Sequence, residues 1–469
     1  SLADRLFFPY RAVDPQDPAA TLTERSLANG PRRVIPSSDW SFTTDRGAVQ
    51  KPSGFESGKI YEVVYRSQNP PVTGLGMAGI RDFISAIKSR SAPDPLKALQ
   101  PSARRSLAYG SSQSGRFLRT FLYQGFNRDE QGRRVFDGVW ANVAGGGRGS
   151  FNHQFSQPSR DARPFFNFFY PTDIFPFTDL TQTDPVTGLS DGILARARKD
   201  GVEPKIFYTN SEYEYYGRAA SLMHTSLDGS SDAPLAPNTR LYVMAGGNHG
   251  PGSIPPARSA NTRYMNNAND YQWIMRGLLA AMQRWLAEDK LPPASVYPRV
   301  ASKELTTLDQ VRFPKRAGMP PPVRLHDVFR LDFGPEFRTR GIVAYEPPKM
   351  GPAFVILVPQ VDADGNSVGG LKTAQMQAPL ATHTGWNLRS PSIGSPEELF
   401  SMTGSYFPFS REVILKRYQD KAGYLTRIRA AAQKLVAEGF LLEKDLPAVE
   451  QVSSREWDFV MTNPPATSP

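Results

Sequence analysis

The stretch of sequence that decides the fold is residues 107–122, which reads Leu-Ala-Tyr-Gly-Ser-Ser-Gln-Ser-Gly-Arg-Phe-Leu-Arg-Thr-Phe-Leu. It starts with a short apolar run, passes through a turn of glycine and serine, and continues with apolar residues at helical spacing. The helically spaced residues are Phe117, Leu118, Phe121 and Leu122. We therefore expect a strand that ends at Tyr109, a sharp turn, and a helix that begins about Gln113.

The spacing of small residues indicates which serine of this turn lies at its centre. A turn this sharp needs small residues two positions before and two positions after the central serine, because larger side chains would collide. With Ser112 at the centre, these positions hold Gly110 and Ser114, whereas with Ser114 at the centre one of them would hold Arg116. The pattern favours Ser112 as the exposed nucleophile.

Strands and helices alternate along the chain on both sides of this turn. Strand candidates are residues 60–65, 139–144, 205–208 and 241–244, and helix candidates are residues 77–87, 217–224 and 271–288. Strands that alternate with helices predict a mostly parallel sheet covered by helices on both faces.

Three other regions of the chain do not show this regular alternation of strands and helices. Residues 1–57 read as an irregular lead-in, and residues 148–200 as a lid insertion rich in Phe, Pro and Asp. After Pro292-Pro293 the pattern becomes mixed strand and helix. We expect a catalytic domain over residues 1–295 and a C-terminal extension over residues 296–469 that packs on it.

A serine nucleophile needs a neighbouring base, which an acid orients. His249 directly follows the strand candidate 241–244, and glycines flank it, so it is the expected base. The loop after strand 205–208 offers two acids, Glu212 and Glu214, which spacing alone does not separate. His153 lies in the insertion and is expected to line a substrate pocket.

Several segments together resemble a poorly characterised bacterial α/β-hydrolase-domain family. They are Gly-Ser-Ser-Gln-Ser-Gly-Arg-Phe-Leu-Arg at 110–119, Glu-Tyr-Tyr-Gly-Arg-Ala-Ala-Ser-Leu at 214–222, the loop of His249, and Thr-Gly-Trp-Asn-Leu-Arg at 384–389. The resemblance spans about residues 55–450. It implies an α/β-hydrolase fold, esterase-like hydrolysis, and Glu214 as the acid.

We expect a serine hydrolase that cleaves a carboxylic ester through an acyl-enzyme, with no metal or organic cofactor. The backbone N–H of Gln113 would supply one donor of the oxyanion hole. The phenylalanines of the insertion suggest a small-molecule ester with a hydrophobic or aromatic part. Alternatives are a lactonase or amidase with the same triad, and a non-catalytic binding protein on a hydrolase scaffold.

The region before the nucleophile departs from the pattern expected for this fold. An α/β-hydrolase normally places four strands before the nucleophile, and only residues 60–65 form a convincing candidate there. We therefore expect an N-terminal segment or a second chain to complete the sheet. The second oxyanion donor would come from that region.

Composition excludes several classes of protein. The chain contains no cysteine, so disulfides, thiolate metal sites and a cysteine nucleophile are absent. The formal net charge is +10, but the basic residues are spread along the chain, so no nucleic-acid partner is expected. No apolar run is long enough for a membrane span. We expect a periplasmic or secreted protein, with the cytoplasm as the alternative.

Overall fold

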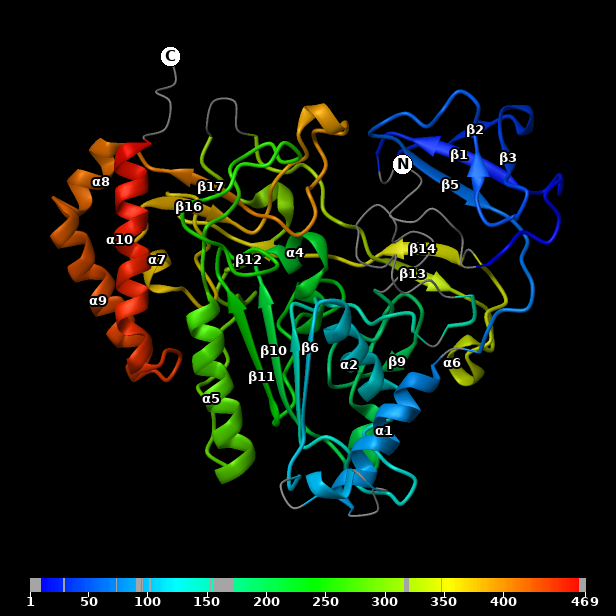
Figure 1. Ribbon diagram of the computed structural model, residues 1–469, viewed down its shortest axis with the longest axis horizontal. Helices are drawn as coiled ribbons and strands as arrows, with labels where there is room; N and C mark the ends of the chain where they lie inside the picture. Colours follow the sequence, from blue (N-terminus) through cyan, green and yellow to red (C-terminus); the bar gives the residue numbers. More distant parts are fainter. Residues whose placement is uncertain are drawn as a thin grey trace.

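Figure 1 shows the computed structural model of the chain. The residues that the structure describes are 10–27, 30–72, 74–89, 94, 96–100, 103–151, 153–155, 173–315, 320–346 and 348–463.

A parallel sheet of four strands, in the order β11-β10-β7-β6, stands at the centre of the described part of the chain (Figure 1). Its strands are β6 (Leu107–Ser111), β7 (Gly138–Asn142), β10 (Lys205–Ser211) and β11 (Thr239–Met244). Every residue of β7 is buried, as expected for a strand covered on both faces.

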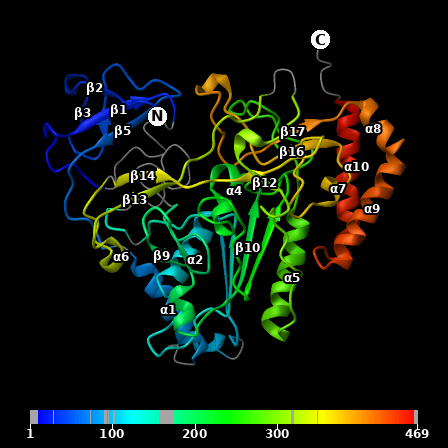
Figure 2. The ribbon, with the colours of Figure 1, turned by 180° about the vertical axis from the view of Figure 1, so that it is seen from behind.

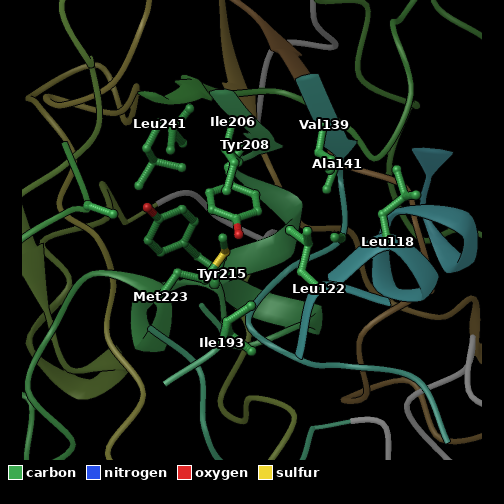
Figure 3. Close-up of a cluster of buried hydrophobic side chains, with 14 of the residues drawn as sticks. Leu118, Leu122, Val139, Ala141, Ile193, Ile206, Tyr208, Tyr215, Met223 and Leu241 are labelled. Carbon is green, nitrogen blue, oxygen red and sulfur yellow. The ribbon is translucent and has the colours of Figure 1, made fainter. Parts of the chain in front are cut away.

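Alternate residues of these strands face two separate hydrophobic cores. Val139, Ile206 and Leu241 pack with α2 (Gln113–Tyr123) on one face, a cluster that Figure 3 shows in part. Trp140 and Phe207 belong to the core on the other face. That core also contains apolar residues of α5 (Gln272–Glu288). The prediction of a parallel sheet with helices on both faces is confirmed.

The N-terminal residues form an antiparallel unit of their own. A three-stranded sheet with the order β2-β1-β5 is built from β1 (Thr21–Arg25), β2 (Arg33–Ile35) and β5 (Ile60–Val64). A hairpin of β3 (Ser41–Phe42) and β4 (Val49–Gln50) adds Phe42 and Val49 to the same small core. The prediction that this region is an irregular lead-in is therefore wrong.

The strand predicted at residues 60–65 exists, but it lies outside the central sheet. β5 pairs antiparallel with β1, with Thr21 opposite Val64. β6 forms the edge of the central sheet, and no described residue before it contributes a strand there. Strand propensity indicates a pleated, half-buried segment without naming its partner, which is why the sequence misplaced β5. Completion of the sheet by an N-terminal segment or a second chain stays a prediction.

The remaining described strands pair in two-stranded sheets. They are β8 (Gln182–Thr183) with β9 (Ser190–Asp191), β12 (Leu305–Thr306) with β15 (Val358–Pro359), β13 (Phe329–Asp332) with β14 (Lys349–Ala353), and β16 (Ala381–Thr384) with β17 (Ser405–Pro408). The other α-helices are α1 (Leu75–Lys88), α3 (Ala195–Lys199), α4 (Tyr213–Gly217), α6 (Phe337–Arg340), α7 (Ala374–Gln377), α8 (Arg411–Tyr418), α9 (Lys421–Ala437) and α10 (Leu446–Thr462). No helix in the described ranges is long and apolar enough to cross a membrane.

The helix predicted over residues 217–224 is broken. α4 ends at Gly217, and a 3-10 helix, η5, covers Ala220–Met223. Between them Ala219 has a φ of 47°, which no α-helix contains, and the carbonyl of Arg218 accepts the N–H of Gly146 at 2.9 Å. A tertiary contact overrides the helical spacing here.

The C-terminal helices of the chain pack on the outside of α5. Figures 1 and 2 show α8, α9 and α10 beyond α5, and the core of that face contains Tyr424 and Ile428 of α9 with Trp457 of α10.

Most of the predicted lid aromatics lie outside the described residues, namely Phe165, Phe166, Phe168, Phe169 and Tyr170. Phe175 and Phe177 are described and buried, and they pack in a small core with Leu222 and Phe354. At these two positions the aromatic rings are part of a core, and the lid itself stays a prediction.

Candidate active site

Ser112 lies at the turn between β6 and α2. Its backbone has φ 58° and ψ −118°, a combination that costs a non-glycine residue roughly 1–3 kcal/mol. The Ser112 N–H donates to the Asn142 carbonyl at 2.8 Å, which fixes the turn to β7. A Cβ atom at Gly110 would collide with the Ser114 carbonyl group, so the turn requires glycine there. The backbone therefore holds the Ser112 side chain out from the end of the sheet.

His249 reaches Ser112 from the loop that follows β11. Gly246 has a φ of 60°, and a Cβ at Gly247 would lie 3.1 Å from the Cβ of Ser211, so both glycines allow a tight loop. The Nε2 atom of His249 lies 2.8 Å from the Oγ atom of Ser112. This is hydrogen-bonding distance for transfer of the serine proton.

Glu214 completes the chain of hydrogen bonds from the first turn of α4. Its Oε1 atom lies 2.5 Å from Nδ1 of His249. Its Oε2 atom accepts the backbone N–H and the hydroxyl of Ser211, both at 2.7 Å. A carboxylate has only acceptors, so Nδ1 of His249 carries the proton and Nε2 is free to accept one. Ser112, His249 and Glu214 thus meet in the arrangement of a catalytic triad.

Glu212, the other candidate for the acid, has different hydrogen-bond partners from Glu214. Its Oε2 atom accepts the N–H of Gly246 at 2.7 Å and the hydroxyl of Ser367, and its Oε1 atom accepts the N–H of Gly385 at 3.1 Å. Burial raises the pKa of the Glu212 carboxyl, whereas these three hydrogen bonds act to lower it. Glu212 binds the backbone of the histidine loop, and Glu214 contacts the imidazole.

Further side chains hold the same loop, and no sequence motif indicates them. The amide of Asn267 donates to the carbonyls of Gly246 at 2.5 Å and of Thr384 at 2.8 Å. The hydroxyl of Tyr271 donates to the carbonyl of Asn248 at 2.9 Å. These partners are far apart in the sequence, so only the folded chain reveals them.

Gln113 is the first residue of α2 and follows the serine directly. The first N–H groups of a helix point out of its N-terminus and favour negative charge. This position is consistent with the predicted role of the Gln113 N–H in an oxyanion hole, which stays a prediction.

A cavity of about 270 Å³ lies beside the histidine loop. Asn248 and Gly250, the neighbours of His249, line it together with Met402 and Thr403. The N–H of His249 donates to the carbonyl of Met402 at 3.4 Å, so the two sides of the cavity are joined. The cavity places both polar and apolar groups close to the imidazole.

His153, the predicted pocket residue, lines a different cavity. That cavity lies at the C-terminal end of α2, next to Tyr123 and Gln124, whereas Ser112 precedes the N-terminal end. The ring of His153 packs edge-on against Phe337 at 4.8 Å between ring centroids. A role for His153 in binding the substrate stays a prediction.

Among the described residues, no group of three or more histidines, aspartates and glutamates is arranged to hold a metal ion.

The fold and the site define the class of protein. A family model described as "Alpha/beta hydrolase domain" matches residues 41–451. The chain belongs to this α/β-hydrolase domain family. Comparisons with curated proteins and with solved structures give no match.

Proposed function

We propose that the protein is a serine hydrolase that cleaves a carboxylic ester with Ser112 as nucleophile, His249 as base and Glu214 as acid. One observation carries the proposal. The Oγ atom of Ser112 lies 2.8 Å from Nε2 of His249, and Nδ1 of His249 lies 2.5 Å from Glu214. Membership of an α/β-hydrolase family supports it independently.

The reaction proceeds in two acyl-transfer steps. His249 takes the hydroxyl proton of Ser112 while the oxygen attacks the ester carbonyl, and the same proton then leaves with the alcohol. In the second step His249 takes a proton from water as it attacks the acyl-enzyme, and then returns that proton to the Ser112 oxygen as the bond to the acyl group breaks and the carboxylic acid is released. Glu214 orients the imidazole and stabilises its charged form in both steps.

The negative oxygen of each tetrahedral intermediate needs hydrogen-bond donors. The backbone N–H of Gln113, at the N-terminus of α2, is the proposed donor from this chain. Loss of one such donor typically slows an enzyme by about 10²–10³-fold.

The cavity beside the histidine loop supports a small ester as substrate. Met402, Pro251 and Ala257 supply apolar wall, while Asn266 and Ser253 supply polar groups. We propose that this cavity receives one side of the ester, with a hydrophobic or aromatic part. A periplasmic or secreted location is part of the same proposal.

Covalent labelling with a fluorophosphonate tests the proposed nucleophile. We expect the wild-type chain to be labelled, Ser112→Ala to lose the label, and Ser114→Ala to keep it. Ser114 is a matched control because it is an exposed serine two residues away on the same turn. Labelling of Ser112→Ala at the wild-type rate would refute the assignment. Complete absence of labelling would instead favour the non-catalytic binding protein.

A substrate screen separates the enzymatic alternatives. Matched acyl esters, lactones and amides are supplied to the wild-type chain, with Ser112→Ala as the blank. We expect the esters to give the highest kcat/KM. Faster turnover of lactones or amides would keep the triad and replace the proposed substrate class.

A further inference from the structure

The cavity at the C-terminal end of α2 is lined by an unusual number of arginines. Its volume is about 360 Å³. Among the described residues, four arginines and no aspartate or glutamate line it, and the arginines are Arg148, Arg196, Arg338 and Arg340. Guanidinium groups match the geometry of carboxylates and phosphates, so this lining is suited to an anion.

Two of the four arginines already have carboxylate partners. Arg338 donates to Asp191 at 2.5 Å, and Arg340 donates to Glu336. Arg196 instead donates to the backbone carbonyl of Tyr123 and to the side chain of Gln124. Carboxylates thus balance two of the four positive charges that line the cavity.

Among the four arginines, Arg148 most strongly indicates a binding site for an anion. The residue is 4% exposed, yet it forms no ion pair within the described part of the chain. One terminal nitrogen donates to the carbonyl of Phe175 at 2.9 Å, and Nε is buried without any hydrogen-bond partner. A buried charge without an anionic partner is costly, so such groups are normally paired.

Aromatic rings form the rest of the wall. The guanidinium carbon of Arg148 lies 3.7 Å from the centroid of the Tyr123 ring, and that of Arg196 lies 5.3 Å from it. Phe337 and His153 also line the cavity, and they pack against each other. The pKa of His153 is lowered, first by burial and then by the charge of Arg148, so its ring is neutral at pH 7.

We propose that this cavity binds a small organic anion, with a carboxylate or phosphate on Arg148 and Arg196 and an apolar part against Phe337 and His153. The site is separate from the triad, because Tyr123, which lines it, lies about 16.5 Å along α2 from Ser112 at 1.5 Å per residue. The inference does not rest on the proposed hydrolase activity.

Isothermal titration calorimetry of the full chain tests the proposal with four probes. They are benzoate, phenyl phosphate, inorganic phosphate and benzyl alcohol, the last being a neutral match for the aromatic anions. We expect one equivalent of benzoate or phenyl phosphate to bind, and the tighter of the two identifies the preferred head group. Failure of both to bind overturns the proposal, as does equally tight binding of benzyl alcohol or of inorganic phosphate.

Matched variants locate the binding. Arg148→Met and Arg196→Gln each remove one charge-assisted contact, so each is expected to weaken binding by roughly ten- to a hundredfold. Arg198→Gln is the control, because Arg198 lies on the same short helix as Arg196, pairs with Glu203 and does not line the cavity. Thermal unfolding verifies that each variant is folded.

If Arg148→Met does not fold, Arg196→Gln still tests the proposal, because Arg196 is exposed and its replacement should not disturb the fold. Unchanged affinity in Arg196→Gln, or an equal loss in Arg198→Gln, would overturn the proposal. Ser112→Ala is expected to bind the probe as the wild type does. Loss of binding in Ser112→Ala would place the probe in the active site and so overturn a separate anion site.

Discussion

The two glutamates that follow β10 should respond differently to the same substitution. In Glu214→Gln the amide oxygen keeps the two hydrogen bonds from Ser211, so the amide NH2 group must face Nδ1 of His249. Nδ1 then becomes the acceptor, and the proton moves to Nε2, which points at Ser112. The imidazole can no longer accept the serine proton.

The expected loss follows from this wrong tautomer. In serine proteases the equivalent change lowers kcat by about 10⁴-fold, or about 5.5 kcal/mol of transition-state stabilisation. We expect a similar fall for Glu214→Gln, with little change in thermal stability, because the amide fills the same space. Hydrolysis of p-nitrophenyl acetate measures kcat, and thermal unfolding measures stability.

Glu212→Gln is the matched comparison. The Glu212 carboxylate accepts from Gly246, Ser367 and Gly385 with both oxygens, and an amide can accept with only one. One buried donor is left unpaired, which costs about 1–3 kcal/mol of stability. We expect a lower unfolding temperature and a much smaller loss of kcat than in Glu214→Gln. A folded Glu212→Gln variant with the larger loss of kcat would refute the assignment of the two acids.

Three other changes test the elbow, the core and the pH response. Gly110→Ala should destabilise the fold by about 1–3 kcal/mol and slow the labelling of Ser112 by about 10²-fold, because the new Cβ collides with the Ser114 carbonyl. Gly79→Ala is the control, because a Cβ at Gly79 meets open space. Phe121→Ala should cost about 3–5 kcal/mol in urea unfolding, because Phe121 is fully buried in the core under the sheet. Burial lowers the pKa of His224 from 6.5 to about 4, so its contribution to stability, present above pH 6.5, is lost as the pH falls towards 4. His224→Gln should remove up to about 3 kcal/mol of that acid sensitivity, and an unchanged difference between unfolding at pH 7 and pH 4.5 would contradict this.

The sequence predicted those parts of the fold that depend on neighbouring residues. The turn around Ser112 is local, because Gly110 and Ser114 are small and helical spacing follows at once. The loop of His249 is local for the same reason, since it follows an apolar strand and contains glycines. The structure places these two side chains in hydrogen-bond contact, although β6 and β11, the strands that precede them, are the two edge strands of the central sheet.

The sequence did not predict features that depend on distant partners. β5 has the composition of a central strand, but its partner β1 comes from a segment whose polar composition hides it. Glu212 and Glu214 lie two positions apart, and part of what distinguishes them is that Ser367 and Gly385, from much later in the chain, bind Glu212. Arg148 gave no signal either, because its burial depends on the packing of α2 against the residues that follow β7.

The anchoring of the histidine loop affects the order in which the active site forms during synthesis. Ser112, Glu214 and His249 have all been synthesised before residue 250, but Ser367 and Gly385 follow more than a hundred residues later. Contacts between segments so far apart form late, because closing a long loop costs conformational entropy. During synthesis the triad side chains therefore emerge well before Ser367 and Gly385, so the anchoring of the histidine loop through Glu212 would be completed late, after its contacts with Asn267 and Tyr271.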